Sequence, residues 1–419
     1  MAASTIGIIC SAPGQTIGVS AFTDSLIEVL HVSRVQLTTA YLIGTAASGF
    51  LLPWGGRLYD RLGSRLMFVA SALLLGMILL FLSAIDTATQ AVSSLLGSET
   101  THSTALGLLI ISFLLLRFSG QGMMTMISRN MVGKWFHRRL GTVSGITGVA
   151  ISGGFTGSIY VFNYCVQSFG WKKTWFFLGL TMGLGIAFFG WLFYRDNPEE
   201  CGLIKDEFLN SKNPAVETSS PAPQIAFTLR QAQRTIAFWA VTIALSIQAL
   251  AITGITFHIN SIGHAAGKSI QESISLFPPV MIISIIAGVV VGWSCARAPL
   301  KYLIMIMMIF QLLGFFGMTD FGTAKGHWMA TIGLGVSGGF FGPLSTVAIP
   351  HFFGLKHLGA ISGKMTSGMV VASGLGPLLL AWSVHYQESY NPAFYLFMLL
   401  PFILFFVAFK ANHPQAHQV

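Results

Sequence analysis

The 419-residue sequence is strongly apolar: hydrophobic residues make up 53% of it and charged residues only 9%, with a mean hydropathy of +0.71. Soluble domains carry about 25% charged residues, so this composition excludes a soluble globular protein and indicates an integral membrane protein. The formal net charge of +9 fits cationic loops at one membrane face, and we expect no nucleic-acid partner.

Apolar runs of about 20 residues predict transmembrane helices, because a helix satisfies its own backbone hydrogen bonds in lipid. The long unbroken runs exclude a β-barrel, whose strands would alternate in polarity. The predicted spans cover residues 4–30, 37–56, 66–86, 105–130, 142–168, 174–194, 235–258, 273–293, 299–318, 327–350, 360–384 and 391–410. No positively charged region precedes the first span, so we expect it to be retained rather than cleaved.

The twelve predicted spans place both termini on one face of the membrane. If that face is cytoplasmic, most loop arginines and lysines are cytoplasmic too, as the positive-inside rule requires. The outer loops then hold only Arg34, Lys172, Lys173, Lys268 and Lys325. We therefore predict cytoplasmic termini.

The longest polar segment, residues 196–234, contains the Pro- and Ser-rich run 212–223 and is predicted to be a cytoplasmic linker. It separates an N-terminal six-helix bundle (1–195) from a C-terminal one (235–419). The sequence Gly-Thr-Val-Ser-Gly at 141–145 opens span five, and Gly-Ala-Ile-Ser-Gly at 359–363 opens span eleven. We expect an all-α membrane protein with twelve transmembrane helices in two pseudo-symmetric bundles, an arrangement typical of secondary transporters.

The segment 56–65 places three arginines and Asp60 between two apolar runs. Its pattern resembles the signature loop of the major facilitator superfamily, which joins the second and third helices; the matching residues are Gly56, Asp60, Arg61, Gly63 and Arg65. A degenerate copy of the pattern lies at 292–301, with Ala296 in place of the aspartate.

Two further segments resemble parts of that family. Residues 116–122 are similar to its second motif, in span four. Residues 195–203, with Phe238-Trp239 and Phe257-His258, are similar to bacterial carriers of the monocarboxylate and oxalate/formate type. The resemblance implies alternating access in a bacterial inner (plasma) membrane. Span eight departs from the carboxylate carriers, because it contains no arginine.

The signature segment is predicted to act as a conformational latch. In the family, its aspartate faces the start of span eleven, which here is the region 354–359. A carboxylate near a helix N-terminus gains about 0.3–1 kcal/mol, enough to bias an outward/inward equilibrium without freezing it. The alternative interpretation is a solvated loop that only obeys the positive-inside rule.

Ionisable residues inside the spans are candidate functional residues, because a charge at the bilayer centre costs about 2.5–3.5 kcal/mol. Arg117 is expected to anchor an anion or to clamp neighbouring helices. Lys364 is expected to contact substrate or to snorkel. Asp24, the carboxylate placed well inside a span, is predicted to couple protons, with His258 as a possible partner. Alternatively, Asp24 pairs with Arg117, and His258 is a satisfied interfacial residue.

Polar residues elsewhere in the spans must face protein or a cavity rather than lipid. Gln15 is predicted to line a central substrate site, since Pro13 and Gly14 break the first span beside it. Weaker candidates for the same role are Tyr160, Asn163 and Gln248. The glycine runs of spans ten and eleven are interpreted as close helix packing rather than a nucleotide-binding loop.

Together these features predict a secondary transporter that moves a small, monocarboxylate-like organic anion, coupled to protons, between two bundles. The alternative function is efflux of drug-like or siderophore-like amphiphiles, favoured by the 12% aromatic content. We expect no enzymatic activity, metal or cofactor, since no catalytic constellation is visible and no cysteine or histidine lies at ligand spacing. The expected partners are the substrate, H⁺ and the lipid bilayer, with the chain as a monomer.

Overall fold

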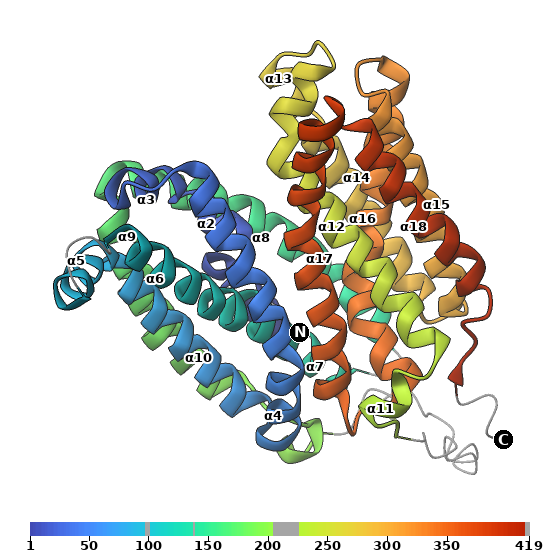
Figure 1. Cartoon of the computed structure of the whole chain (residues 1–419). Helices are drawn as coiled ribbons and strands as arrows, with labels where there is room; N and C mark the ends of the chain where they lie inside the picture. The colour runs from blue at the N-terminus through green and yellow to red at the C-terminus, as the bar shows by residue number, and fades with distance from the viewer. Residues whose placement is uncertain (97–100, 137–138, 204–225, 415–419) are drawn as a thin grey trace. The chain divides into compact units, whose positions relative to one another are not determined.

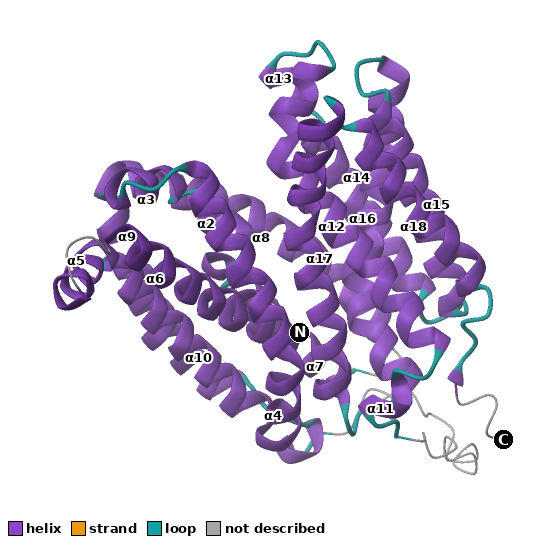
Figure 2. Cartoon of the chain, in the orientation of Figure 1, coloured by secondary structure: helices purple, strands orange, loops and turns teal. Residues whose placement is uncertain are grey.

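The computed structural model describes residues 1–96, 101–136, 139–203 and 226–414. These residues form helices and connecting turns, with no strand among them (Figure 2). Ten helical stretches in this part of the chain are long and apolar enough to cross a membrane. Phe50, Leu184 and Phe188 are 73%, 66% and 63% exposed, an apolar surface that suits lipid rather than water. The predicted all-helical membrane fold is confirmed.

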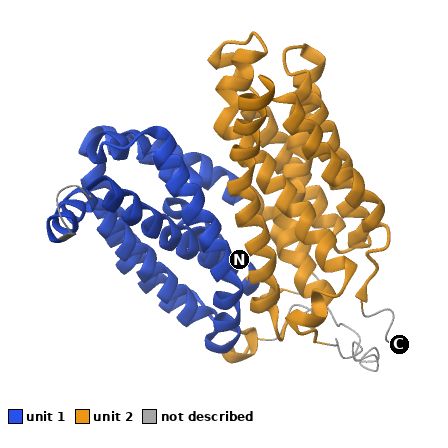
Figure 3. Ribbon diagram, viewed as in Figure 1, with its two compact units in different colours: residues 1–131, 150–196 blue, residues 132–149, 197–419 orange. Residues whose placement is uncertain are grey.

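The chain divides into two compact units, coloured separately in Figure 3. Unit 1 holds residues 1–131 and 150–196, and unit 2 holds residues 132–149 and 197–419. Residues 132–149, which the sequence places in the N-terminal half, cluster with unit 2. Each unit is described by itself below.

Unit 1 is built around α4, two helices that meet at a kink at Gly63 and pack against α6, η3, α9 and α10. Its elements, labelled in Figure 1, are α1 (Ala2–Ile9), η1 (Ala12–Gly14), α2 (Thr16–Ser20), α3 (Thr23–Leu30), α4 (Arg34–Ser83), α5 (Ile85–Leu96), α6 (Thr101–Leu116), η3 (Arg117–Met124), α7 (Thr125–Trp135), α8 (Leu140–Phe169), α9 (Trp171–Leu180), η4 (Thr181–Ile186) and α10 (Ala187–Phe193). Helix α7 ends, and helix α8 begins, within unit 2.

The first predicted span is not one helix, which corrects the expectation for residues 4–30. It is broken into α1, η1, α2 and α3. Pro13 lies inside the short 3₁₀ turn, and Gln15 is extended, with φ −90° and ψ 165°. Proline offers no N–H and glycine loses more entropy than other residues on ordering, so Pro13-Gly14 interrupts the helical hydrogen-bond ladder.

The second and third predicted spans are joined more closely than the sequence suggested. Residues 56–65 do not form an open loop; α4 stays helical through them except at Gly63, where φ is 82° and ψ is 176°. Glycine adopts this conformation at little cost, and other residues rarely do. Ten spanning stretches are therefore found where twelve were predicted, because α4 contains two predicted spans and the first span is broken.

Unit 2 packs α16 against α14 and α15, and α12 against α17. Its further elements are η5 (Pro198–Cys201), α11 (Leu229–Ala232), α12 (Ile236–Ala265), α13 (Ile270–Ile274), α14 (Phe277–Ser294), α15 (Leu300–Thr319), α16 (Ala324–Phe353), α17 (Leu358–Gln387) and α18 (Asn391–Ala408). Thr235 and Thr323 cap α12 and α16. The Pro- and Ser-rich run 212–223 of the predicted linker lies outside the described residues.

Candidate functional site

Arg117, which the sequence analysis proposed as an anion anchor, is a deeply buried cation of unit 1. It is 1% exposed and begins η3, a π-helical stretch that follows α6 directly. A π-helix widens the turn and displaces side chains from the regular helical register, and such stretches are frequent at functional sites. The π-helical backbone thus displaces the Arg117 side chain from the position that it would have in a regular α-helix.

The guanidinium of Arg117 is held by neutral groups. Its Nη1 donates to the Gly14 carbonyl at 3.5 Å and to Thr16 Oγ1 at 3.3 Å. Its Cζ lies 5.3 Å from the centre of the Tyr41 ring. The Nε has no hydrogen-bond partner, and no carboxylate of the described residues forms an ion pair with Arg117. The result is a buried positive charge without a counter-ion.

Two glycines bring the broken first span onto this arginine. A Cβ on Gly14 would lie 2.7 Å from the Gly120 Cα, and a Cβ on Gly120 would meet Gly14 equally closely. The two backbones therefore touch, so that η1 presents the Gly14 carbonyl and Thr16 to Arg117. Tyr41 contacts the same group, since its hydroxyl lies 2.9 Å from Thr16 Oγ1.

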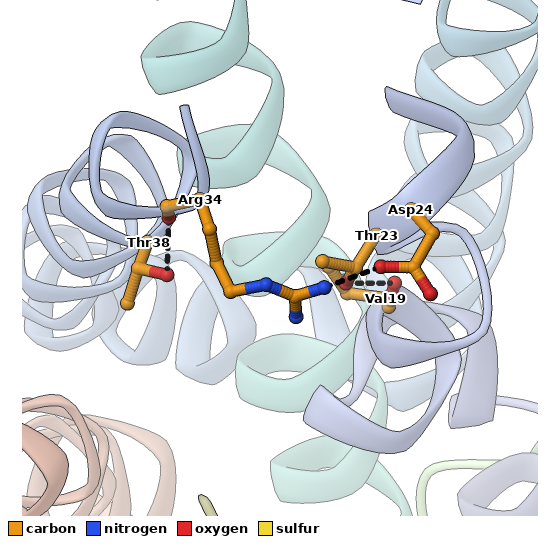
Figure 4. Close-up of polar contacts among 5 residues, drawn as sticks. All are labelled: Val19, Thr23, Asp24, Arg34 and Thr38. Atoms are coloured by element: carbon orange, nitrogen blue, oxygen red, sulfur yellow. Dashed lines mark hydrogen bonds and ion pairs between the residues drawn. The ribbon is translucent and has the colours of Figure 1, made fainter. Parts of the chain in front are cut away.

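Asp24 does not occupy the low-dielectric position that the sequence suggested. It lies on α3, its side chain is 86% exposed, and it pairs with Arg34 at 2.6 Å, as Figure 4 shows. The break at residues 10–15 is the reason, because it removes the continuous helix in which Asp24 would have been buried. Asp24 is therefore no partner of Arg117, and the argument for proton coupling from burial does not hold.

The remaining substrate-binding candidates of unit 1 have different environments. Gln15 is half-buried and donates from Nε2 to Ser11 Oγ at 3.0 Å, next to the Arg117 contacts. Tyr160 and Asn163 are exposed on α8, the former 73%. Of the three, only Gln15 adjoins the elements around Arg117.

In unit 2, Gln248 is 3% exposed on α12 and pairs with a residue that the sequence analysis missed. Gln311 Nε2 on α15 donates to Gln248 Oε1 at 3.2 Å and to the Ala244 carbonyl at 3.0 Å. Gln311 is the polar residue in the otherwise apolar run 303–315, and that isolation is the sequence signal that could have drawn attention to it.

The other two candidates of unit 2 have different environments. His258 Nε2 donates to the Pro377 carbonyl at 3.0 Å, since a carbonyl oxygen can only accept. Lys364 on α17 is half-buried and forms no hydrogen bond or ion pair with the described residues. Unit 2 thus supplies a second cation without an acidic partner.

The signature segment is anchored within unit 1 by residues at the end of α10. The Asp196 carboxylate accepts from the Ser64 backbone N–H, directly after the break at Gly63. Arg65 Nε donates to the Tyr194 carbonyl at 3.1 Å.

The other residues of the signature segment differ in exposure: Gly56 is buried, Asp60 is half-buried and Arg61 is exposed. Sequence reasoning missed Asp196; the predicted latch to residues 354–359 stays a prediction.

The sequence profile of the Major Facilitator Superfamily matches residues 4–336. The chain belongs to the Major Facilitator Superfamily. The predicted family is thereby confirmed, whereas no finding identifies the monocarboxylate or oxalate/formate branch. No curated protein sequence matches the chain.

Solved structures of the superfamily share this fold. The proton:xylose symporter XylE bound to 6-bromo-6-deoxy-D-glucose is similar with a TM-score of 0.70, 14% identity and coverage of 97% of this chain and 94% of that one. A double-tryptophan XylE mutant reaches 0.67 with 15% identity, covering 98% and 94%. The human organic anion transporter MFSD10 reaches 0.61 with 14% identity, covering 97% and 98%. As a member of the superfamily, the chain is a multi-pass membrane transporter rather than an enzyme.

Proposed function

We propose that this transporter carries a small, monocarboxylate-like organic anion across a bacterial inner membrane by alternating access, together with a proton. In this proposal the chain acts as a monomer with cytoplasmic termini. The observation that carries the proposal is the Arg117 guanidinium, which is buried, has no acidic partner among the described residues and leaves its Nε unpaired.

The energetics favour an anionic ligand at Arg117. A charge inside a membrane-spanning segment costs about 2.5–3.5 kcal/mol on insertion scales, and neutral contacts at 3.3–3.5 Å offset this poorly. A carboxylate would form charge-assisted hydrogen bonds, roughly twice as strong as neutral ones. Lys364 adds a second cation without an acidic partner, which further favours an anion over a cationic amphiphile.

The structural relatives support transport of polar solutes without deciding among them. MFSD10 is described as an organic anion transporter and XylE as a proton:xylose symporter. At 14% identity these descriptions are analogies for this chain.

A co-transported proton follows from the charge of the substrate. Moving one negative charge into a cell with a negative interior costs about 2.3 kcal/mol per 100 mV of membrane potential. A proton carried with the anion makes the cycle electroneutral. His258 is better suited to this role than Asp24, because its Nε2 is fixed on Pro377 while Nδ1 can accept a proton.

Uptake into proteoliposomes tests the proposal. We expect transport of labelled propionate and L-lactate but not of the lipophilic cation tetraphenylphosphonium. Arg117→Gln should lower kcat/KM for both anions at least about 10-fold, because removing one partner of a buried charge pair costs about 2–5 kcal/mol. Arg34→Gln, which neutralises an exposed arginine of the same unit, is the matched control and should transport normally. Transport of only the lipophilic cation, or normal anion uptake by Arg117→Gln, would refute the proposal.

A further inference from the structure

The five glycines at residues 333–342 of α16 divide into two groups. Gly333, Gly335 and Gly339 face neighbouring helices: a Cβ on Gly335 would lie 2.8 Å from Ile283 Cβ, and one on Gly339 would lie 2.6 Å from Ala287 Cβ. Close helix packing, as predicted from the sequence, explains these three.

Gly338 and Gly342 differ from these three, because one lies against polar side-chain atoms and the other against open space. A Cβ on Gly338 would first meet two polar atoms, Ser284 Oγ at 3.2 Å and Gln248 Nε2 at 3.7 Å. A Cβ on Gly342 would meet nothing within 4 Å. Residues four apart share one face of a helix, so the open space at Gly342 lies one turn along the same face from the Gln248 and Ser284 side chains at Gly338.

Gln311 fixes the orientation of the Gln248 side-chain amide. Gln311 Nε2 has two hydrogens, and both are used, on Gln248 Oε1 and on the Ala244 carbonyl. Gln248 must therefore turn its oxygen toward Gln311 and its NH₂ toward Gly338. That NH₂ makes no hydrogen bond with the described residues, although the side chain is 97% buried, being 3% exposed.

We infer that Gln248 Nε2 and Ser284 Oγ form a donor subsite that binds an uncharged oxygen acceptor of the substrate, such as a hydroxyl or carbonyl oxygen. Gly338 and Gly342 leave the room for that group. Gln311 is a positioning residue, since it is fully buried and acts by holding Gln248. The inference rests on the proposed function and extends it: the substrate carries oxygen atoms for this subsite in addition to its charge.

Binding to the purified full-length protein, measured by calorimetry with three probes, tests this inference. Propionate carries the charge alone, L-lactate adds a hydroxyl, and D-xylose offers hydroxyls without charge. We expect wild type to bind L-lactate more tightly than propionate. Gly338→Ala places a methyl group in the subsite and should weaken binding of L-lactate and D-xylose about 3- to 10-fold, the value of one hydrogen bond. Propionate affinity should change less than about 2-fold.

Gln311→Met, of similar length, should reproduce this pattern and raise KM for L-lactate without lowering kcat. Gly107→Ala, at a glycine of unit 1 with open space around its Cβ position, should behave as wild type. The inference is overturned if L-lactate and D-xylose lose no more affinity than propionate in both Gly338→Ala and Gln311→Met, or if wild type binds neither of them. The proposed function fails separately, if Arg117→Gln leaves the affinity for propionate unchanged.

Discussion

At the scale of single residues, the local surroundings decide which of the predicted polar groups are suited to chemistry. Arg117 is buried among neutral groups, and Lys364 has no acidic partner among the described residues. Asp24 is exposed and already paired with Arg34. Two cations without counter-ions among the described residues thus lie inside the spans, whereas the acid that the sequence offered for proton transfer is exposed and ion-paired.

In the proposed function, the coupled proton is carried by His258 rather than by Asp24. We expect His258→Gln to abolish the stimulation of L-lactate uptake by an imposed pH gradient, because glutamine can still donate to the Pro377 carbonyl but cannot titrate. Asp24→Asn should keep the stimulation. Uptake with and without a gradient checks both variants; a gradient response lost in Asp24→Asn and kept in His258→Gln would reverse the assignment.

At the scale of helices, the functional features lie where the helices are interrupted. The break at Pro13-Gly14 meets the π-helical turns of η3, and the break at Gly63 is closed by Asp196. Non-helical backbone is tolerated at membrane depth only where protein or a cavity satisfies it. The Asp196 carboxylate meets this requirement, because it accepts the first N–H of the helix that follows Gly63.

Removing this cap should destabilise unit 1. We expect Asp196→Ala to lower the free energy of unfolding by about 1 kcal/mol, the usual value of an N-cap. Asp196→Asn should retain most of it, since asparagine is an equally good capping residue. Thermal unfolding of the purified variants measures the difference, and equal Tm values for Asp196→Ala and wild type would show that the cap contributes nothing.

The sequence predicted the spans well where hydropathy alone decides, as for α12, α15 and the two helices that meet at Gly63 in α4, but not where the first span is interrupted. Pro13 and Gly14 were recognised as breakers, yet the extent of the break depends on the contact between Gly14 and Gly120. Gln311 and Asp196 were missed for the same reason: each acts through a partner distant in sequence, and hydropathy contains no information about such pairs.

At the scale of the whole molecule, membership of the superfamily implies an alternating-access cycle. The signature segment is the element of unit 1 predicted to bias that cycle. Its position is stabilised within unit 1 by Arg65 and Asp196. Asp60, the residue of the predicted latch, is half-buried in the same segment.

If that latch operates, Asp60→Asn should slow turnover several-fold, because one carboxylate at a helix N-terminus contributes about 0.3–1 kcal/mol or more when partly buried. The affinity for L-lactate should stay within about 2-fold. Steady-state uptake gives kcat, and calorimetry gives the affinity. Unchanged kcat together with unchanged accessibility of the outer mouth to a thiol reagent would contradict the latch.

The most direct test of the central claim, that Arg117 binds the negative charge of the substrate, compares L-lactate with its uncharged methyl ester by calorimetry. We predict that wild type binds L-lactate at least about 10-fold more tightly than the ester, and that Arg117→Gln removes this preference. Equal affinities for acid and ester in wild type, or an undiminished preference in Arg117→Gln, would contradict the account.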